Sequence, residues 1–324
     1  MLDIIMTHYK EPWDVGKKFF SMLDLQRGVD FNDFRVILVN DGQECALPDK
    51  CFCGRPYQVE QISIDHAGVS AARNEGLRCA KDEWVMFCDF DDTFANVYAL
   101  KDILDVLPAP SMNLLWSNLY VEKLGENGMV SLSMEGLNGV FNHAKVYRRQ
   151  FLLDHDLWFD EFFPYCEDSL FNTIAYTVCK QEQIGQIVTK NALYIWCDTE
   201  NSVSNTINNR NSARYYTYYR NKKVCNLYKE YRPYDQYCAM IARTIIDAYY
   251  ALNVRALDEK MQEMKQDFLA WYHEHKMEWK QVPYETLKLV KEKSWKCFSP
   301  DDSETCAEIS VTKWLKQLEE RNDE

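Results

Sequence analysis

The stretch that decides the fold is Trp84-Val85-Met86-Phe87-Cys88-Asp89-Phe90-Asp91-Asp92-Thr93-Phe94. Five mostly apolar residues end in three carboxylates, which is typical of a buried strand that delivers acidic side chains to the edge of a sheet. In extended backbone Asp89 and Asp91 point to one side and Asp92 to the other, unless the chain turns there. Clustered carboxylates repel one another, so a fold keeps them together mainly when a cation joins them. The stretch therefore predicts a hard divalent ion, Mg²⁺ or Mn²⁺, brought with a phosphate-bearing substrate.

The composition limits the classes of partner and compartment. With 324 residues, 47% of them hydrophobic, the chain is long enough for one large core and a smaller appended unit. Its formal net charge of -13 disfavours nucleic acid and anionic membrane as partners. The first residues lack the pattern of a signal peptide, so we expect the 12 cysteines to be reduced and the protein to be cytoplasmic. No apolar run reaches the ~18 residues of a membrane span, so we expect any membrane contact to be peripheral.

The segments before Trp84 predict a parallel sheet. An apolar strand at 2–6, a helix at 13–26 and a second strand at 34–39 form a crossover unit, and the second strand ends at Asn40-Asp41-Gly42. In such sheets ligands bind beyond the carboxyl ends of the strands. The residues after Met6, Val39 and Cys88 are therefore expected to meet at one edge.

Two later helices carry charged residues at their beginnings. A helix at 71–80, with Ser70 as its expected N-cap, places Arg73 one turn in, where it can meet an anionic phosphate. A surface arginine on a core helix is the alternative interpretation. Glu167 and Asp168 open an apolar helix at 169–178, and by spacing alone they are typical of helix capping.

From about residue 208 the chain changes to long amphipathic patterns with almost no glycine, which predicts a helical C-terminal region. Its first part combines basic and aromatic side chains. An amphipathic helix with solvated cations and packed tyrosines is the preferred interpretation, and a nucleic-acid-binding surface is the alternative. The basic residues in question are Arg210, Arg214, Arg220, Lys222, Lys223, Lys229 and Arg232, interleaved with Tyr215, Tyr216, Tyr218, Tyr219 and Tyr228.

Taken together, the motifs resemble those of glycosyltransferase family 2 in order and spacing. They are Thr7 in the first loop, Val39-Asn40-Asp41-Gly42, Ala72-Arg73-Asn74-Glu75-Gly76-Leu77, Asp89-Phe90-Asp91-Asp92 and Glu167-Asp168. The resemblance covers about residues 1–205 and implies the α/β GT-A fold, a Rossmann-like α/β/α sandwich with a mostly parallel central sheet. That fold binds a nucleotide sugar and a divalent metal. We expect residues 1–205 to be the catalytic domain and residues 206–324 to be a helical C-terminal region.

The resemblance also implies roles for individual residues. Thr7, Tyr9, Asp41, Arg73 and Asp89 would bind the donor, and Trp196 belongs to a late segment, continuing through Ser202-Val203-Ser204, that would close over it. Asp91 and Asp92 would hold Mn²⁺ or Mg²⁺, with Asp91 as the preferred direct ligand. Asp168 would be the catalytic base, with Glu167 beside it.

Some positions depart from the family pattern. The first loop has Met6 where proline is usual, and Gln43 stands where the usual pattern after Asp41-Gly42 has serine. These departures concern the contacts to the base, whereas the Asp-rich and Glu-Asp elements are intact.

The resemblance implies a metal-dependent inverting glycosyltransferase that moves a sugar from a nucleoside-diphosphate donor, most simply a UDP-sugar, to an acceptor hydroxyl. The acceptor would be a glycan or other surface polymer, a lipid-linked intermediate or a protein. Alternatives are a glycosyltransferase acting on modified bases of phage DNA and a non-catalytic sugar-nucleotide-binding protein. A nucleotidyltransferase is disfavoured because the first strand lacks a Gly-rich phosphate loop.

Overall fold

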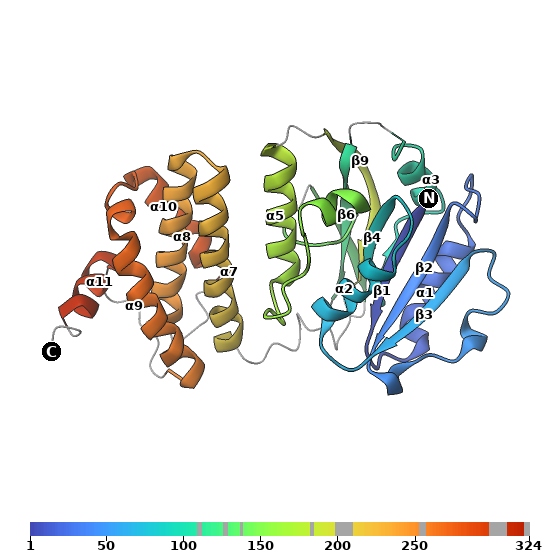
Figure 1. The fold of residues 1–324 in the computed structure, drawn as a ribbon, viewed down its shortest axis with the longest axis horizontal. Helices are drawn as coiled ribbons and strands as arrows, with labels where there is room; N and C mark the ends of the chain where they lie inside the picture. Colours follow the sequence, from blue (N-terminus) through green and yellow to red (C-terminus); the bar gives the residue numbers. More distant parts are fainter. Residues whose placement is uncertain are drawn as a thin grey trace. The chain divides into compact units, whose positions relative to one another are not determined.

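The computed structural model describes residues 1–108, 112–125, 129–136, 139–181, 185–197, 210–252, 257–297 and 310–320. The chain forms two compact units, Met1–Thr206 and Ile207–Glu324. The division expected at residue 205 lies next to this boundary, and the roles expected for the two parts remain predictions. Each unit is described by itself below (Figure 1).

The first unit is built on a nine-stranded sheet in the part of the chain that the structure describes. Its order is β3-β2-β1-β4-β8-β6-β9-β5, with β7 paired to β6 outside this path. β1, β2, β3 and β4 are parallel neighbours, β6 and β9 are also parallel, and β8 runs antiparallel between β4 and β6. The strands are β1 (Leu2–His8), β2 (Phe34–Asp41), β3 (Gln58–Ile64), β4 (Trp84–Asp89), β5 (Thr93–Phe94), β6 (Met112–Leu124), β7 (Val130–Glu135), β8 (Lys145–Arg148) and β9 (Gly185–Trp196).

Helices cover both faces of this sheet because the central strands are apolar on both sides. Leu2, Ile4 and Met6 of β1 belong to one core, whereas Ile5 belongs to the other. This alternation is the period of two that extended backbone imposes. The first core includes residues of α1 (Trp13–Asp24) and α3 (Ala99–Leu104), and the second includes residues of α2 (Val69–Cys79), α4 (Arg149–Asp154) and α5 (Glu167–Gln181). The predicted α/β/α sandwich with a mostly parallel sheet is confirmed.

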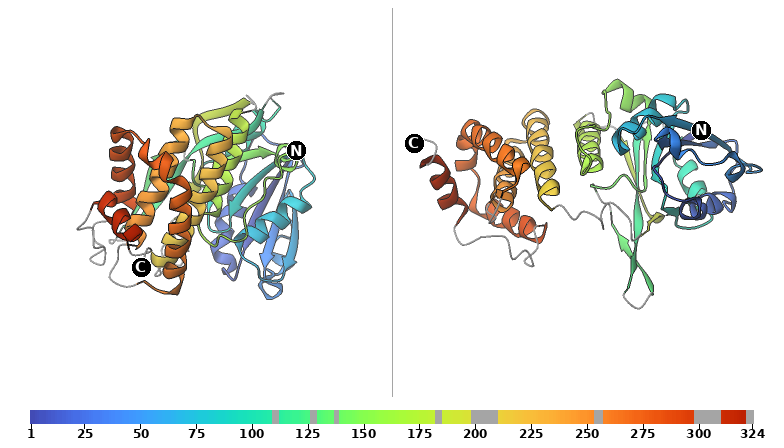
Figure 2. Two further views of the ribbon diagram at one scale, coloured as in Figure 1. Left: turned by 60° about the vertical axis from the view of Figure 1, so that its left-hand side comes forward. Right: turned by 90° about the horizontal axis from the view of Figure 1, so that it is seen from below.

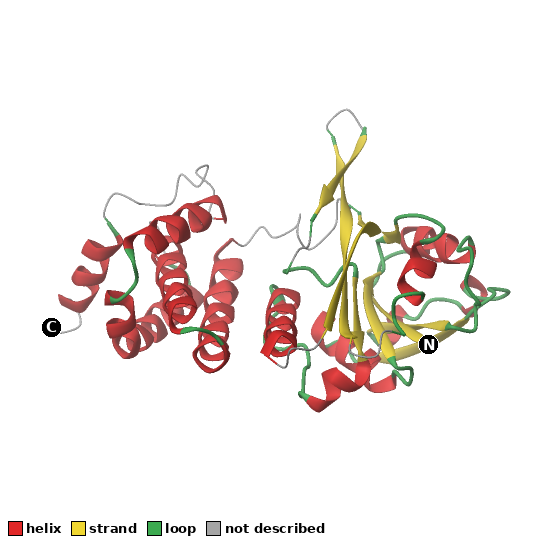
Figure 3. Ribbon diagram, turned by 90° about the horizontal axis from the view of Figure 1, so that it is seen from above, coloured by secondary structure: helices red, strands yellow, loops and turns green. Residues whose placement is uncertain are grey.

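Two local predictions about α2 differ from the structure. α2 begins at Val69 rather than at Ala71, its N-cap is Gly68, and no side chain caps it. The prediction of Ser70 as N-cap was therefore wrong, and the buried Ser70 hydroxyl has no hydrogen-bond partner among the described residues. β6 extends to Leu124 and forms with β7 a hairpin that projects from the sheet (Figures 2 and 3).

The second unit is helical in the part that the structure describes. Its helices are α7 (Arg210–Tyr231), α8 (Tyr234–Leu252), α9 (Glu259–Lys280), α10 (Tyr284–Cys297) and α11 (Val311–Glu320). Tyr218 of α7 is buried, and its hydroxyl donates to Asp267 of α9 at 2.6 Å. Lys222 of α7 pairs with the same carboxylate at 2.5 Å. Tyr218 thus packs within the unit, as the preferred interpretation expects, whereas Lys222 is paired and Arg214 is buried rather than solvated. Nucleic acid as an acceptor stays an untested alternative.

No described helix is long and apolar enough to cross a membrane.

Candidate active site

Three of the predicted donor residues, Thr7, Asp41 and Asp89, lie at or near the carboxyl ends of adjacent parallel strands. Thr7 of β1 stands opposite Val39 of β2 and Asp89 of β4, and Asp41 is the last residue of β2. This register follows from the parallel pairing of β1 with both neighbours. The edge that the sequence predicts as a ligand site is therefore formed by the expected segments.

A turn directly after β4 brings two of the three carboxylates together. The Asp92 N–H donates to the Asp89 carbonyl oxygen at 3.4 Å, so the chain does not continue as a strand through Asp91. Phe90, inside the turn, is buried against α1, where a Cβ at Gly16 would lie 2.2 Å from the ring. The turn is thus locked by packing, and Gly16 is required for the close approach.

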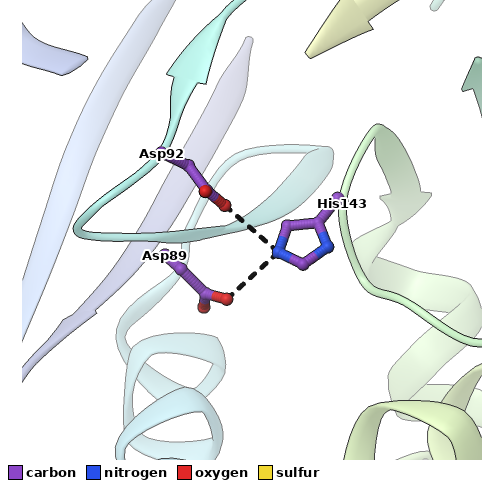
Figure 4. Close-up of side chains that lie close together, drawn as sticks. All are labelled: Asp89, Asp92 and His143. Atoms are coloured by element: carbon purple, nitrogen blue, oxygen red, sulfur yellow. Dashed lines mark hydrogen bonds and ion pairs between the residues drawn. The ribbon is translucent and has the colours of Figure 1, made fainter. Parts of the chain in front are cut away.

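His143 joins the two carboxylates that the turn brings together. Its Nε2 atom lies 3.1 Å from Asp89 Oδ2 and 3.1 Å from Asp92 Oδ2 (Figure 4). Asp92 is fully buried, and its Oδ1 accepts from the backbone N–H of Cys197 at 2.9 Å. Asp89 is partly exposed, with 32% of its side chain accessible. The cluster therefore reaches from the protein interior to the surface of the site.

Electrostatics in this cluster follows from burial and opposite charge. Burial alone would lower the pKa of His143, but the carboxylates of Asp92 and Asp89 raise it to about 10. Burial alone would raise the pKa of Asp89, but Arg73 and His143 outweigh it and lower that pKa. The pKa of Asp92 is raised because burial outweighs the attraction of His143. Without a bound cation, the imidazolium is the positive charge that holds the two carboxylates together.

The three side chains fit a divalent cation. Among the described residues they form the group of ligand atoms, all within 4.8 Å of one another, that can share one ion. Asp92 Oδ2 is buried and makes no hydrogen bond of good geometry within the described chain; it faces His143 Nε2 at 3.1 Å. The predicted metal pair was Asp91 and Asp92. Asp92 belongs to this group, whereas Asp91 lies partly buried in the turn and is not one of its three members.

Arg73 links the Asp-rich turn to the Glu-Asp motif. Its guanidinium donates to Asp89 Oδ1 at 2.9 Å and to Glu167 Oε1 at 2.8 Å, and it lies over the ring of Phe159. The side chain is buried, and although burial opposes its charge, Asp89 and Glu167 raise its pKa. Arg73 is therefore not a surface residue of a core helix, which was the alternative interpretation.

Glu167 and Asp168 are the first residues of α5. Burial, and then the neighbouring charge of Glu167, raise the pKa of Asp168 to about 7, while Arg73 and His143 act in the opposite direction. Asp168 Oδ1 accepts from the N–H of Ser169 at 2.6 Å. A carboxyl group with this pKa exchanges a proton near neutral pH, as a general base requires.

Asn172, one turn further along α5, ties this helix to the loop that carries His143. Its Nδ2 donates to the Asp168 carbonyl at 2.8 Å, the Val140 carbonyl at 3.1 Å and Asn142 Oδ1 at 2.9 Å. The buried Lys145, which follows the loop, donates from Nζ to the carbonyl of Phe141. These bonds fix the position of the His143 loop relative to Asp168.

Tyr9, Asp41 and His66 form a second group on the same edge. The rings of Tyr9 and His66 stack with centroids 4.3 Å apart and an interplanar angle of 11°. Asp41 Oδ2 lies 2.8 Å from His66 Nδ1, and Asp41 also accepts from the N–H groups of Ala67 and Gly68. Asp41 therefore holds the loop before α2 in place. Tyr9 is 37% exposed, and Lys10 Nζ lies over its ring, 4.6 Å from the centroid.

Trp196, at the end of β9, lies near His143. Its ring stacks on Phe141 at 5.5 Å and lies 6.2 Å from the His143 ring. The expected continuation through Ser202-Val203-Ser204 lies outside the described residues. Trp196 is only partly buried.

Three site residues were not singled out from the sequence: His66, His143 and Asn172. For His66, its place two residues before Gly68, which has a φ of 95°, was the available signal. His143 belongs to none of the motifs, and no spacing connects it to Asp89 or Asp92 across more than 50 positions. Its role depends on β8 lying next to β4 in the sheet.

Residues 3–169, just over half of the chain, match the family described as Glycosyl transferase family 2. The chain therefore belongs to this family, as its motifs predict.

Among curated relatives, a poly(ribitol-phosphate) beta-N-acetylglucosaminyltransferase, TarS, of Staphylococcus aureus is 27% identical over 160 residues, which cover 44% of this chain and 27% of TarS. The uncharacterized glycosyltransferase EpsJ of Bacillus subtilis is 23% identical over 198 residues, 53% of this chain and 55% of EpsJ. The matched regions thus span about a quarter and about half of these relatives.

Solved structures confirm the GT-A fold. The crystal structure of S. aureus TarS 1-349 in complex with UDP-GlcNAc has a TM-score of 0.58 at 17% identity and covers 91% of this chain and 92% of that chain. A mannosyltransferase from Pyrobaculum calidifontis, in complex with GDP-Man and Mn²⁺, has a TM-score of 0.53 at 11% identity, with coverage of 98% and 84%. At these identities the likeness concerns the fold.

Proposed function

We propose that the protein is a metal-dependent inverting glycosyltransferase that transfers a sugar from a nucleoside-diphosphate donor to an acceptor hydroxyl. One observation carries the proposal: Arg73 connects Asp89, a member of the candidate cation site, to Glu167, which precedes a carboxyl group with a pKa near neutrality. A cation site and a general base on one sheet edge are the two groups that such a transfer needs. Family membership supports the same reaction class.

Asp168 is the proposed general base. It takes the proton of the acceptor hydroxyl as that oxygen attacks the anomeric carbon of the donor, and the bond from this carbon to the diphosphate oxygen breaks in the same displacement. No covalent sugar–enzyme intermediate is needed. Glu167 acts indirectly, by pairing with Arg73 and by raising the pKa of Asp168.

The departing diphosphate develops negative charge, and a bound divalent cation would supply the compensating positive charge. Asp92 would hold this ion, and Asp91 remains a predicted ligand. Arg73 keeps Asp89 ionised, and would hold it beside the donor's diphosphate. We place Thr7, Tyr9, Asp41, Arg73, Asp89 and Trp196 around the donor, with the exposed Tyr9 ring against the base.

A UDP-sugar is the proposed donor. The TarS relative is named as an N-acetylglucosaminyltransferase, and the TarS structure with the same fold holds UDP-GlcNAc. The proposed acceptor is a hydroxyl group on a glycan or another surface polymer, because the TarS relative is named for a poly(ribitol-phosphate). Mn²⁺ or Mg²⁺ is the proposed metal.

Nucleotide release from a panel of nucleotide sugars tests the function. The protein is incubated with Mn²⁺ and each UDP-, GDP- and dTDP-sugar, and free nucleoside diphosphate is measured with and without polyol-phosphate or glycan acceptors. We expect release from a UDP-sugar that rises with acceptor and is lost in Asp168→Asn. Binding without release from any donor would instead support a non-catalytic sugar-nucleotide-binding protein.

A further inference from the structure

The cluster of Asp89, Asp92 and His143 offers a nitrogen atom as a possible metal ligand in addition to the carboxylate oxygens. His143 comes from the loop before β8, whereas both carboxylates come from the turn after β4. The imidazole Nε2 is its polar connection to the site, since Nδ1 is buried and makes no hydrogen bond among the described residues. His143 therefore contacts the two carboxylates through one ring atom, Nε2.

The imidazole does not satisfy the hydrogen-bonding capacity of both carboxylates. A single proton on Nε2 can be donated well to one carboxylate only, and the hydrogen bond of good geometry goes to Asp89. Asp92 Oδ2 keeps an ion pair at 3.1 Å but no hydrogen bond within the described chain, although Asp92 is fully buried. A divalent ion satisfies all three atoms together, because it needs no proton and accepts a lone pair from each.

The separations also fit coordination. Two ligands at right angles, each about 2.1 Å from a small divalent ion, lie about 3.0 Å apart. Nε2 lies 3.1 Å from each carboxylate oxygen. The side chains therefore need little movement to surround an ion in place of the shared proton.

The position of the imidazole is fixed by its neighbours. Its ring centroid lies 5.8 Å from that of Phe141, 5.6 Å from that of Tyr194 and 6.2 Å from that of Trp196. Tyr194 also receives the N–H of Asp89 on its hydroxyl at 3.3 Å, so the same side chain positions both partners. Packed rings restrict the rotamer of His143, which preorganises the side chain for a ligand role.

We infer that His143 is a direct nitrogen ligand of the catalytic metal, together with Asp89 and Asp92, and that this nitrogen makes the site prefer Mn²⁺ to Mg²⁺. Mg²⁺ favours a shell of oxygen atoms, whereas imidazole nitrogen suits transition ions better. The inference rests on the proposed function, since it assumes that the reaction uses a metal. It differs from the expected Asp91 and Asp92 pair in naming Asp89 and His143.

Electron spin echo envelope modulation of bound Mn²⁺ tests the ligand directly. Full-length protein is labelled with ¹⁵N-histidine and titrated with Mn²⁺ in the presence of UDP. We expect a ¹⁵N coupling of directly bound imidazole, absent in His143→Gln and kept in His273→Gln, a variant of an exposed histidine in α9. We also expect His143→Gln to weaken Mn²⁺ binding about 10-fold or more and Mg²⁺ binding less.

The results distinguish the ligand role of His143 from the metal requirement of the reaction. Mn²⁺ that binds with UDP but shows no histidine coupling overturns the role of His143 and leaves the metal-dependent function intact. Full transfer activity in excess EDTA, with no Mn²⁺ bound, overturns the metal requirement itself. If His143→Gln fails to fold, a wild-type spectrum without a directly bound nitrogen still overturns the role of His143.

Discussion

Replacing Asp168 with asparagine should change stability and activity in opposite directions. The folded-state pKa of Asp168, raised to about 7, lies above the ordinary value of 3.8. The folded protein therefore holds this proton more tightly than the unfolded chain. The resulting stability is fully present below about pH 4 and is lost as the pH rises through about 7. At higher pH the ionised Asp168 carboxylate destabilises the folded state, whereas the neutral asparagine does not.

The size of the effect follows from the shift. A difference of about three pKa units corresponds to about 4 kcal/mol between the two protonation states. Asp168 is partly exposed, so solvent reduces this amount, and we expect Asp168→Asn to be more stable than wild type by about 1 to 3 kcal/mol near pH 8. Near pH 4 the two proteins should be about equally stable, because the wild-type carboxyl is then protonated.

Chemical denaturation of the full chain at a series of pH values measures the free energy of unfolding, and donor turnover is measured on the same samples. Wild-type activity should rise with an apparent pKa near 7, and Asp168→Asn should lose about 10²-fold or more. The exposed Asp33→Asn serves as a control with unchanged turnover. A variant that is less stable than wild type across the whole range, or one that remains active, would refute the account of Asp168.

Three further results are expected. Arg73→Met should destabilise the fold by about 2 to 4 kcal/mol, because it leaves Glu167 buried without its partner. Adding Glu167→Gln should recover part of this loss, which a double-mutant cycle of denaturation midpoints measures. Strict additivity of the two changes would argue against the pairing. Tyr9→Ala should raise the donor KM by about 10-fold with a smaller change in kcat, since stacking on a base contributes about 1–3 kcal/mol, and an unchanged KM would remove Tyr9 from the base site. Removing metal with EDTA should abolish turnover and re-adding Mn²⁺ should restore it, whereas activity that survives chelation would contradict metal dependence.

Local sequence patterns predicted the structure correctly where a pattern is compatible with one type of element. Five apolar residues followed by carboxylates specify a buried strand that ends at a sheet edge, and β4 ends at Asp89 as this pattern predicts. The crossover from β1 through α1 to β2 follows from the same reasoning. The spacing of Glu167 and Asp168 places them at the start of a helix, but it does not distinguish a catalytic role from helix capping.

The sequence by itself determined the α/β class, the parallel order of the first strands, the family, and the carboxylate-bearing edge. These depend on periodicity and on short motifs, which act over a few residues. Only the tertiary structure decided which acidic side chains meet. The turn after β4 reverses the alternation of an extended strand and pairs Asp89 with Asp92, and the adjacency of β8 to β4 delivers His143 from 51 residues beyond Asp92. Such contacts are set by sheet order and packing, and no local pattern records them.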